Sequence, residues 1–246
     1  SHQLSENSEL RNKQLSENFT VIIGNPPYSN SSPLGTSKHT YPKLRSEIKE
    51  SWVNTSRHKQ KSALYDLYIH AFKWAEDRIG EGDGVVAYIT NNNWVEKNIG
   101  DGMRQELHKK FSHIYVVNLM GNIRNKRFGS ESEEGENIFG SNSQAGIAIV
   151  FLVRNTESQS QTISYFQLDG ALKTQQKLDE LERLQSIEGL QKSGYFRDIK
   201  PDSHNDWLQQ IDASLHKGIP IYNKNTNSTA LLNVVSSGIK TNRDAW

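Results

Sequence analysis

Two kinds of apolar pattern alternate along the first two thirds of the chain. Short uninterrupted apolar runs are typical of strands buried on both faces, whereas apolar residues spaced three and four apart are typical of amphipathic helices. Strands are predicted at 19–23, 84–90, 114–119 and 146–153, and helices at 43–53, 62–79 and 101–111. Strands that alternate with helices indicate an open parallel α/β sheet, in which the strand ends and the functional site share one edge.

The pattern changes after Arg154. A polar linker at 155–161 is followed by an alternating segment, 162–168, which predicts a half-buried strand. The next segment predicts a charged helix with leucines on one side, namely Leu172, Leu178, Leu181 and Leu184. The sequence from there to residue 246 is mostly polar and irregular. We therefore divide the chain into an arm at 1–18, an α/β part at 19–154 and a second, unfinished region at 155–246.

The composition narrows the chemistry. The 246 residues include no cysteine, which excludes disulfides, thiolate zinc sites and cysteine nucleophiles. The eight histidines are dispersed, without the paired spacing of a helical metal site, so we expect no metal. No apolar stretch is long enough to span a membrane, and we expect a cytoplasmic protein with no membrane partner. The net charge of +1 predicts no strong non-specific grip on nucleic acid.

The residues that carry chemistry are Asn25-Pro26-Pro27-Tyr28, directly after the first strand. Asn25 offers a side-chain carbonyl and Pro26 a main-chain carbonyl, and neither proline has an N–H that competes for them. Pro27 also forces Pro26 into an extended conformation, which stiffens the loop. Two fixed acceptors suit the exocyclic amine of a nucleobase, because accepting both N–H bonds concentrates electron density on a nitrogen whose lone pair is delocalised into the ring.

Tyr28 adds a ring face on which a base can stack, a contact worth about 1–3 kcal/mol. Such a contact offsets part of the cost, about a few kcal/mol, of turning a base out of a duplex. The alternative interpretation is an ordinary turn, since asparagine, proline and glycine are turn residues. The strand before the motif and the α/β elements after it favour a site.

The motif and the segments after it resemble the N6-adenine and N4-cytosine DNA methyltransferases. The matching segments are 25–28, 63–79, 84–94, 136–140 and 147–151. The resemblance implies that Asn25 and Pro26 accept the hydrogens of the target amine and that Tyr28 stacks on the target base. It also implies that Phe139 packs against the other face of that base. We assign Asn25 to the cofactor-binding residues as well.

A narrower resemblance connects the segments 66–75, 118–124 and 237–246 with single-chain, ATP-dependent (type ISP-like) restriction–modification enzymes. It implies that 19–154 is the catalytic half of a Rossmann-like methyltransferase sheet and that 155–246 begins a target-recognition region. The implied reaction is methyl transfer from S-adenosylmethionine to the N6 amine of adenine in DNA, since asparagine at position 25 is typical of the adenine enzymes.

The donor site is the part of the family pattern that is missing. In this family a glycine-rich turn and an acidic residue bind S-adenosylmethionine ahead of the motif, and only 24 residues precede Asn25. We therefore expect an excerpt that binds the donor weakly, with most of the donor site in a missing N-terminal portion of the same polypeptide. The strand at 19–23 then exposes an edge, and we expect self-association through it rather than cover by the arm at 4–17.

Two other functions use the same motif. Protein-glutamine and RNA amino methyltransferases resemble the DNA enzymes here, because an amide or a base amine poses the same hydrogen-bonding problem. A non-catalytic DNA-reading module with a vestigial pocket is the third hypothesis. The long loop after the motif and the large C-terminal extension favour methylation of DNA.

Overall fold

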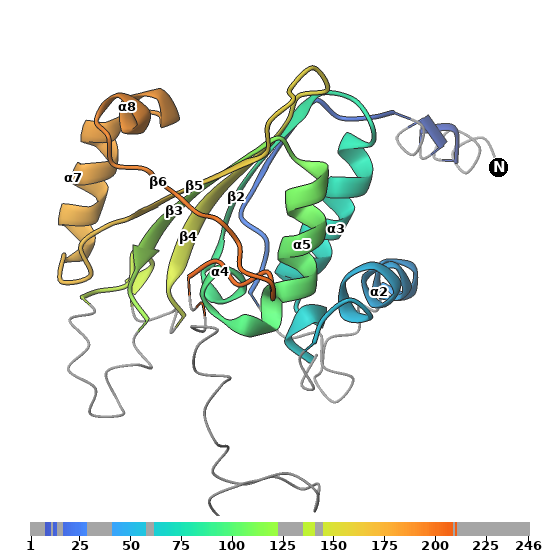
Figure 1. Cartoon of the computed structure of the whole chain (residues 1–246), viewed down its shortest axis with the longest axis horizontal. Helices are drawn as coiled ribbons and strands as arrows, with labels where there is room; N and C mark the ends of the chain where they lie inside the picture. The colour runs from blue at the N-terminus through green and yellow to red at the C-terminus, as the bar shows by residue number, and fades with distance from the viewer. Residues whose placement is uncertain are drawn as a thin grey trace, which may run out of the picture. The chain divides into compact units, whose positions relative to one another are not determined.

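The chain folds around one mixed sheet with helices on both faces (Figure 1). In this computed structural model the described residues are 8–10, 12–13, 17–28, 41–57, 62–122, 135–140, 145–208 and 210. The chain divides into a unit that ends at Gln209 and a second that begins at Gln210, and the elements below belong to the first. Its sheet has six strands in the order β1-β2-β4-β3-β5-β6.

The strands and helices confirm the predicted elements, apart from shifts of a few residues at their ends. The strands are β1 Val21–Gly24, β2 Gly84–Asn91, β3 His113–Met120, β4 Ile147–Arg154, β5 Thr162–Gln167 and β6 Arg197–Asp198. The helices are α2 Pro42–Ile48, α3 Leu67–Ile79, α4 Asn93–Glu96, α5 Asp101–Lys110, α7 Thr174–Leu184 and α8 Ile187–Lys192. A π-helical turn, Lys49–Val53, extends α2, and 3-10 turns at Ser62–Tyr65 and Asn98–Gly100 precede α3 and α5.

The prediction of a parallel sheet is wrong for β4. β1 and β2 pair in parallel, and so do β3 and β5, but β4 lies between β2 and β3 and runs antiparallel to both. An uninterrupted apolar run indicates burial on both faces and carries no information about strand direction. The C-terminal ends of β1, β2, β3 and β5 still meet at one edge of the sheet, because all four run the same way.

α3 illustrates how the sequence builds the helix layer that covers one face of the sheet together with α5 (Figure 1). Its apolar side chains recur at helical spacing, and those of Tyr68, Phe72 and Ile79 are buried in the main core. The helix ends at Gly80, whose φ of +63° is a conformation that glycine adopts without strain. Replacing a buried phenylalanine such as Phe72 by alanine costs about 3–5 kcal/mol, since a cavity remains.

The opposite face is covered by α7 and α8 (Figure 1). Leu184 of α7 and Leu190 of α8 pack with Val117 of β3 in a second apolar cluster. The predicted leucine side of this helix is partly wrong, because Leu178 is 42% exposed and Lys177 beside it is fully buried. Hydrophobic spacing alone did not reveal that a lysine occupies the inward position.

β1 is an edge strand whose sole neighbour in the described sheet is β2. Ile22 points into the core and is 8% exposed, whereas Val21 and Ile23 point away from it and are 59% and 79% exposed. The predicted exposed edge is therefore confirmed. The prediction for the arm at 4–17 falls largely outside the described residues.

A segment after β6 returns to the helix layer through a buried ion pair. Nη2 of Arg104 on α5 lies 2.5 Å from Oδ1 of Asp206, and both side chains are almost fully buried. Other guanidinium nitrogens donate to the carbonyl oxygens of Trp94 and Asn205, at 2.8 and 2.7 Å. The ring of Trp207 packs edge-on against Trp94, with centroids 5.6 Å apart. These contacts tie the end of the unit to α4 at the C-terminal edge of the sheet.

Candidate active site

The Asn25-Pro26-Pro27-Tyr28 loop leaves the sheet where β1 stops pairing with β2. The last register pair is Gly24 with Tyr88, and the two prolines cannot continue the ladder because they have no N–H. The loop therefore turns away at the C-terminal edge of the sheet. Asn25 is exposed, Pro26 is buried and Tyr28 is half-buried, so the loop is anchored at its second residue and open at its first.

Tyr28 and Asn25 are joined directly. The Tyr28 hydroxyl donates to Oδ1 of Asn25 at 2.8 Å and also lies 3.4 Å from the carbonyl oxygen of Ile89 on β2. Burial raises the pKa of Tyr28 to about 12, so the hydroxyl keeps its proton at neutral pH and acts as a donor. A carbonyl oxygen has two lone pairs. Oδ1 of Asn25 can therefore accept a second hydrogen bond from a bound amine while Tyr28 holds it.

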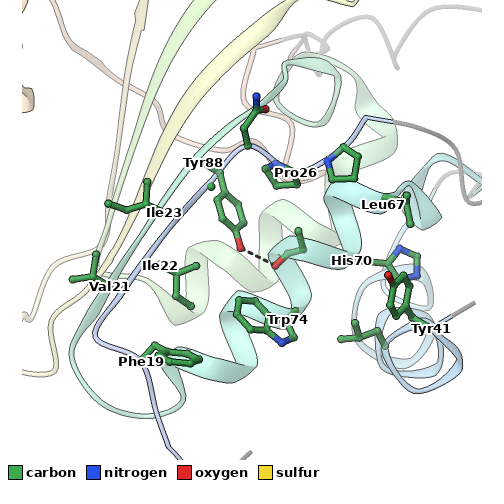
Figure 2. A pocket seen from close by; sticks show the side chains of 15 residues that line it. Phe19, Val21, Ile22, Ile23, Pro26, Tyr41, Leu67, His70, Trp74 and Tyr88 are labelled. Atoms are coloured by element: carbon green, nitrogen blue, oxygen red, sulfur yellow. Dashed lines mark hydrogen bonds between the residues drawn. The ribbon is translucent and has the colours of Figure 1, made fainter. Parts of the chain in front are cut away.

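A hollow of about 650 Å³ lies beside the loop, along the free edge of β1. Figure 2 shows Pro26 at one end of it, with Leu67, His70 and Trp74 of α3 on the helix side and Phe19 at the far end. The Tyr88 hydroxyl donates to the carbonyl oxygen of Ala71 at 3.3 Å and closes the floor. Tyr28 and Phe139 are not among the lining residues. The hollow is thus a feature of the β1 edge and does not contain the predicted pair of stacking rings.

Three titratable residues lie in the first turn of α3, and His70 among them lines the hollow. Burial raises the pKa of the Asp66 carboxyl to about 7. Tyr68 is fully buried, and this burial is the main reason why its pKa is raised. The nearby Asp66 carboxyl raises the pKa further, whereas a hydrogen bond with the Asn91 side chain lowers it. Burial also lowers the pKa of His70, which favours the neutral form of its imidazole. Sequence reasoning did not single out Asp66 or Tyr68, although both lie in the segment 63–79 that follows the motif.

Phe139 lies on a short segment, 135–140, that comes just before β4. Its side chain is 40% exposed, while the neighbouring Ile138 packs on the second apolar cluster, where Tyr28 also packs. Asn137 fixes the segment, since its Nδ2 donates to the carbonyl oxygens of Gly121 and Ala145 and its Oδ1 accepts from the Phe139 N–H at 2.9 Å. The structure thus brings the segments of Tyr28 and Phe139 to one cluster. That the two rings hold a base between them stays a prediction.

Comparison with known proteins identifies the family of this chain. The family model for the Eco57I restriction-modification methylase matches residues 1–125, slightly more than half of the chain. The chain belongs to this family. No curated protein matches the sequence of this methylase domain.

Three solved structures of longer chains are similar to the methylase domain. It is 35% identical, with a TM-score of 0.80, to an ATP-dependent type ISP restriction-modification enzyme, LlaBIII, solved bound to DNA; the match covers 92% of this chain and 15% of that one. It is 32% identical, with a TM-score of 0.78, to a nuclease-deletion mutant of the type ISP enzyme LlaGI, over 90% of this chain and 21% of that one. A third match, to DrdV in a DNA complex, has 31% identity and a TM-score of 0.72 over 85% of this chain and 20% of that one. The methylase domain therefore spans about a fifth or less of the length of these relatives.

A buried polar network that sequence reasoning missed crosses the C-terminal edge of the methylase domain. Nδ2 of Asn118 on β3 donates to Oε1 of Glu96 and to the Tyr165 hydroxyl, both at 2.8 Å, and Nδ2 of Asn92 donates to the same Glu96 oxygen at 2.7 Å. Oδ1 of Asn92 is buried without a hydrogen-bond partner among the described residues. The sequence signal was present, because Asn91-Asn92-Asn93 ends a buried strand at the edge where sites form.

The described part of the methylase domain contains no group of three histidine, aspartate or glutamate residues arranged to hold a metal ion. None of its helices is long and apolar enough to cross a membrane.

Proposed function

We propose that this methylase domain transfers a methyl group from S-adenosylmethionine to the exocyclic N6 amine of adenine in DNA, as part of a restriction–modification enzyme. The observation that carries the proposal is the exposed Oδ1 of Asn25, held by the Tyr28 hydroxyl at the C-terminal edge of the sheet and followed by Pro26. Membership of the methylase family and the likeness to two restriction-modification enzymes, one solved bound to DNA and one with a DNA substrate mimic, support it.

The chemistry follows from two acceptors on a stiff loop. Oδ1 of Asn25 and the carbonyl oxygen of Pro26 each accept one N–H of the target amine, which localises the nitrogen lone pair as the nitrogen becomes tetrahedral. A bond forms between this nitrogen and the methyl carbon of the donor while the carbon–sulfur bond breaks, and the nitrogen then loses one proton to solvent. Because Tyr28 stays protonated, it does not compete for the amine hydrogens and keeps Asn25 oriented.

We further propose that the target base is turned out of the duplex and stacks on Tyr28, with Phe139 against its other face. Both residues lie on segments that pack on the same apolar cluster, and the Phe139 ring is left partly exposed. Stacking on an aromatic ring contributes about 1–3 kcal/mol, enough to offset much of the cost of extrusion.

We propose that a donor-binding part of the protein pairs with the free edge of β1 and holds S-adenosylmethionine next to the motif. S-adenosylmethionine supplies an electrophilic methyl group, and the described residues supply the acceptor side of the reaction. An exposed apolar surface lies next to the motif. It consists of the side chains of Val21 and Ile23 and of the hollow beside Asn25. A donor-binding part that pairs with β1 would cover this surface and bring the methyl group to Asn25, which makes Asn25 a contact of the cofactor as well.

The test is methylation by the enzyme that contains this domain. Labelled donor and a DNA library, followed by digestion to nucleosides and mass spectrometry, distinguish N6-methyladenine from N4-methylcytosine. Asn25→Ala should lower the rate by about 100–1,000-fold with DNA binding retained, because one preorganised acceptor is lost. Label appearing instead in RNA or in a glutamine side chain would replace the substrate, and near-normal turnover by Asn25→Ala would refute the site.

A further inference from the structure

The first turn of α7 contacts the segment that carries Phe139. The Thr174 backbone N–H donates to Oε2 of Glu136 at 3.1 Å, and its hydroxyl donates to the carbonyl oxygen of Asn137 at 3.0 Å. One turn further on, Nζ of Lys177 donates to the carbonyl oxygen of Glu136 at 2.7 Å. Two residues of one helix therefore hold two consecutive peptide units of the segment.

Burying Lys177 at its position costs folding free energy. Its side chain is fully buried on the inward side of α7, where hydrophobic spacing would place a leucine. Removing an ammonium group from water costs several kcal/mol unless it is hydrogen-bonded. A leucine would supply the packing without this cost. The lysine therefore contributes something besides burial, and the hydrogen bond that it donates to the Glu136 carbonyl oxygen is one such contribution.

The other sides of the segment are fixed as well. Asn137 is hydrogen-bonded to the carbonyl oxygens at the end of β3 and the start of β4. Gly121 lets the two backbones approach, because a Cβ at this position would lie 2.8 Å from Cα of Asn137. The backbone of 135–140 is thus held by the ends of β3 and β4 and by α7, while the Phe139 side chain is 40% exposed.

We propose that Thr174 and Lys177 are positioning residues for the target base, which act by fixing the backbone that presents Phe139. This rests on the proposed function, in which Phe139 packs on the extruded base. α7 thereby connects the helix layer over β3 to the residue proposed to pack on the base, and loss of either contact lets the ring move away from the base.

The experiment uses the enzyme that contains this domain with two DNA duplexes. One has adenine at the target position and is used to measure kcat. The other has 2-aminopurine there, which lacks the amine at position 6 and reports base extrusion by its fluorescence. Thr174→Val removes the hydroxyl at constant shape, Thr174→Ser keeps it, and Lys177→Met keeps the apolar stem. Thr174→Val and Lys177→Met should lower kcat about tenfold, since a small misplacement of a positioned group has effects of this size or larger. They should also reduce the 2-aminopurine fluorescence gain, with DNA affinity within about twofold of wild type, while Thr174→Ser behaves like wild type. Thr156→Val is the control, because its hydroxyl bond to Asp83 lies at the other edge of the sheet.

A double-variant comparison separates this inference from the proposed function. If Thr174 acts through Phe139, Phe139→Ala combined with Thr174→Val should be no worse than Phe139→Ala alone. Additive losses, or equal losses in Thr174→Val and Thr174→Ser, would overturn the positioning role. Unchanged fluorescence and kcat in Phe139→Ala would instead refute the base contact in the proposed function. Thermal unfolding of each variant checks that the domain has folded.

Discussion

The Tyr28 hydroxyl donates a hydrogen bond of 2.8 Å to Oδ1 of Asn25, so the ring proposed to stack on the base is tied to the amide proposed to accept from its amine. Only two prolines separate the two residues, and neither can rotate freely about φ. Base stacking and amine activation are therefore expected to depend on each other, because a shift of the ring also turns the Asn25 amide.

Variants at Tyr28 separate the two roles. Tyr28→Phe keeps the ring and loses one neutral hydrogen bond, worth about 0.5–1.5 kcal/mol, so single-turnover methylation should slow by about 2- to 12-fold. Tyr28→Ala also loses stacking, which adds about 1–3 kcal/mol. Tyr195→Phe, which changes a half-exposed tyrosine beyond β5, serves as the control. Equal losses in Tyr28→Phe and Tyr28→Ala would show that the ring itself contributes nothing.

Asp66→Asn should raise stability at alkaline pH. The folded-state pKa of about 7 lies above the ordinary aspartate value of 3.8, so the folded state binds the proton more tightly than the unfolded state does. The penalty for this carboxyl is absent below pH 3.8, grows between pH 3.8 and about 7, and is complete above that range. Because the Asp66 carboxyl is partly exposed, solvent screens part of this penalty. We therefore expect Asp66→Asn to raise the free energy of unfolding by about 1–2 kcal/mol at pH 8. Denaturant unfolding at a series of pH values measures it.

Asp83 should show the opposite dependence of stability on pH in the same unfolding experiments. Hydrogen bonds from the Thr156 N–H and hydroxyl lower its pKa, so its carboxylate stabilises the fold above the unfolded-state pKa and this contribution is lost in acid. Asp83→Asn should therefore lose stability at neutral pH and match wild type in acid. The Asp66 assignment is wrong if Asp66→Asn shows the same pH dependence as Asp83→Asn.

Asp206→Ala should destabilise the domain strongly, because it leaves Arg104 buried without its carboxylate. Breaking one side of a buried ion pair costs about 3–5 kcal/mol. Glu81→Ala is the matched control, since Glu81 pairs with Arg154 while 86% exposed, and such a pair contributes about 0–1 kcal/mol. Urea unfolding followed by tryptophan fluorescence reports both, with Trp207 close to the pair. A small loss in Asp206→Ala would mean that water enters and solvates Arg104.

The exposed β1 edge predicts that the 246-residue chain self-associates through Val21 and Ile23. Unpaired backbone on an apolar strand invites another strand. Light scattering should show a mass that increases with concentration, and Ile23→Lys should reduce it. Leu178→Lys, at an exposed leucine on α7, controls for added charge. A strict monomer at high concentration would contradict the prediction.

Much of this fold was readable because apolar patterns report burial. The strands and helices at 19–119 match the periodicity of their apolar residues closely. The motif was visible because proline cannot donate to the hydrogen-bond ladder of a sheet, so two prolines after an apolar strand mark its end. The direction of β4 was not visible in its own residues. The polar stretch between β3 and β4 did contain a clue, since it lacks the helical pattern that a parallel crossover requires.

The remaining misses share a physical cause. Lys177 and Asn118 are polar residues whose partners lie far away along the chain or on the backbone, and Asp66 is perturbed by burial in the folded chain, whereas the periodicity of a segment reflects apolar burial alone. Lys177 reads as a solvated helix residue until Glu136 is placed beside it. The base-binding role of Phe139 came from resemblance, and nothing in its own neighbourhood of sequence predicts which helix holds it.

The insertion of β4 between β2 and β3 constrains the order in which the sheet can be assembled during synthesis. β2 emerges with only β1 as its partner, and β3 emerges with none, because β4 and β5 both follow it in the chain. The helices α3 and α5 can form early from local contacts, yet the centre of the sheet closes only when residue 154 has been made. Such non-local closure is slow and leaves apolar strands exposed in the meantime. A break in the chain between β3 and β4 would therefore separate β4 from both of its partners in the described sheet, and we expect the two fragments to complete the sheet only when they are combined.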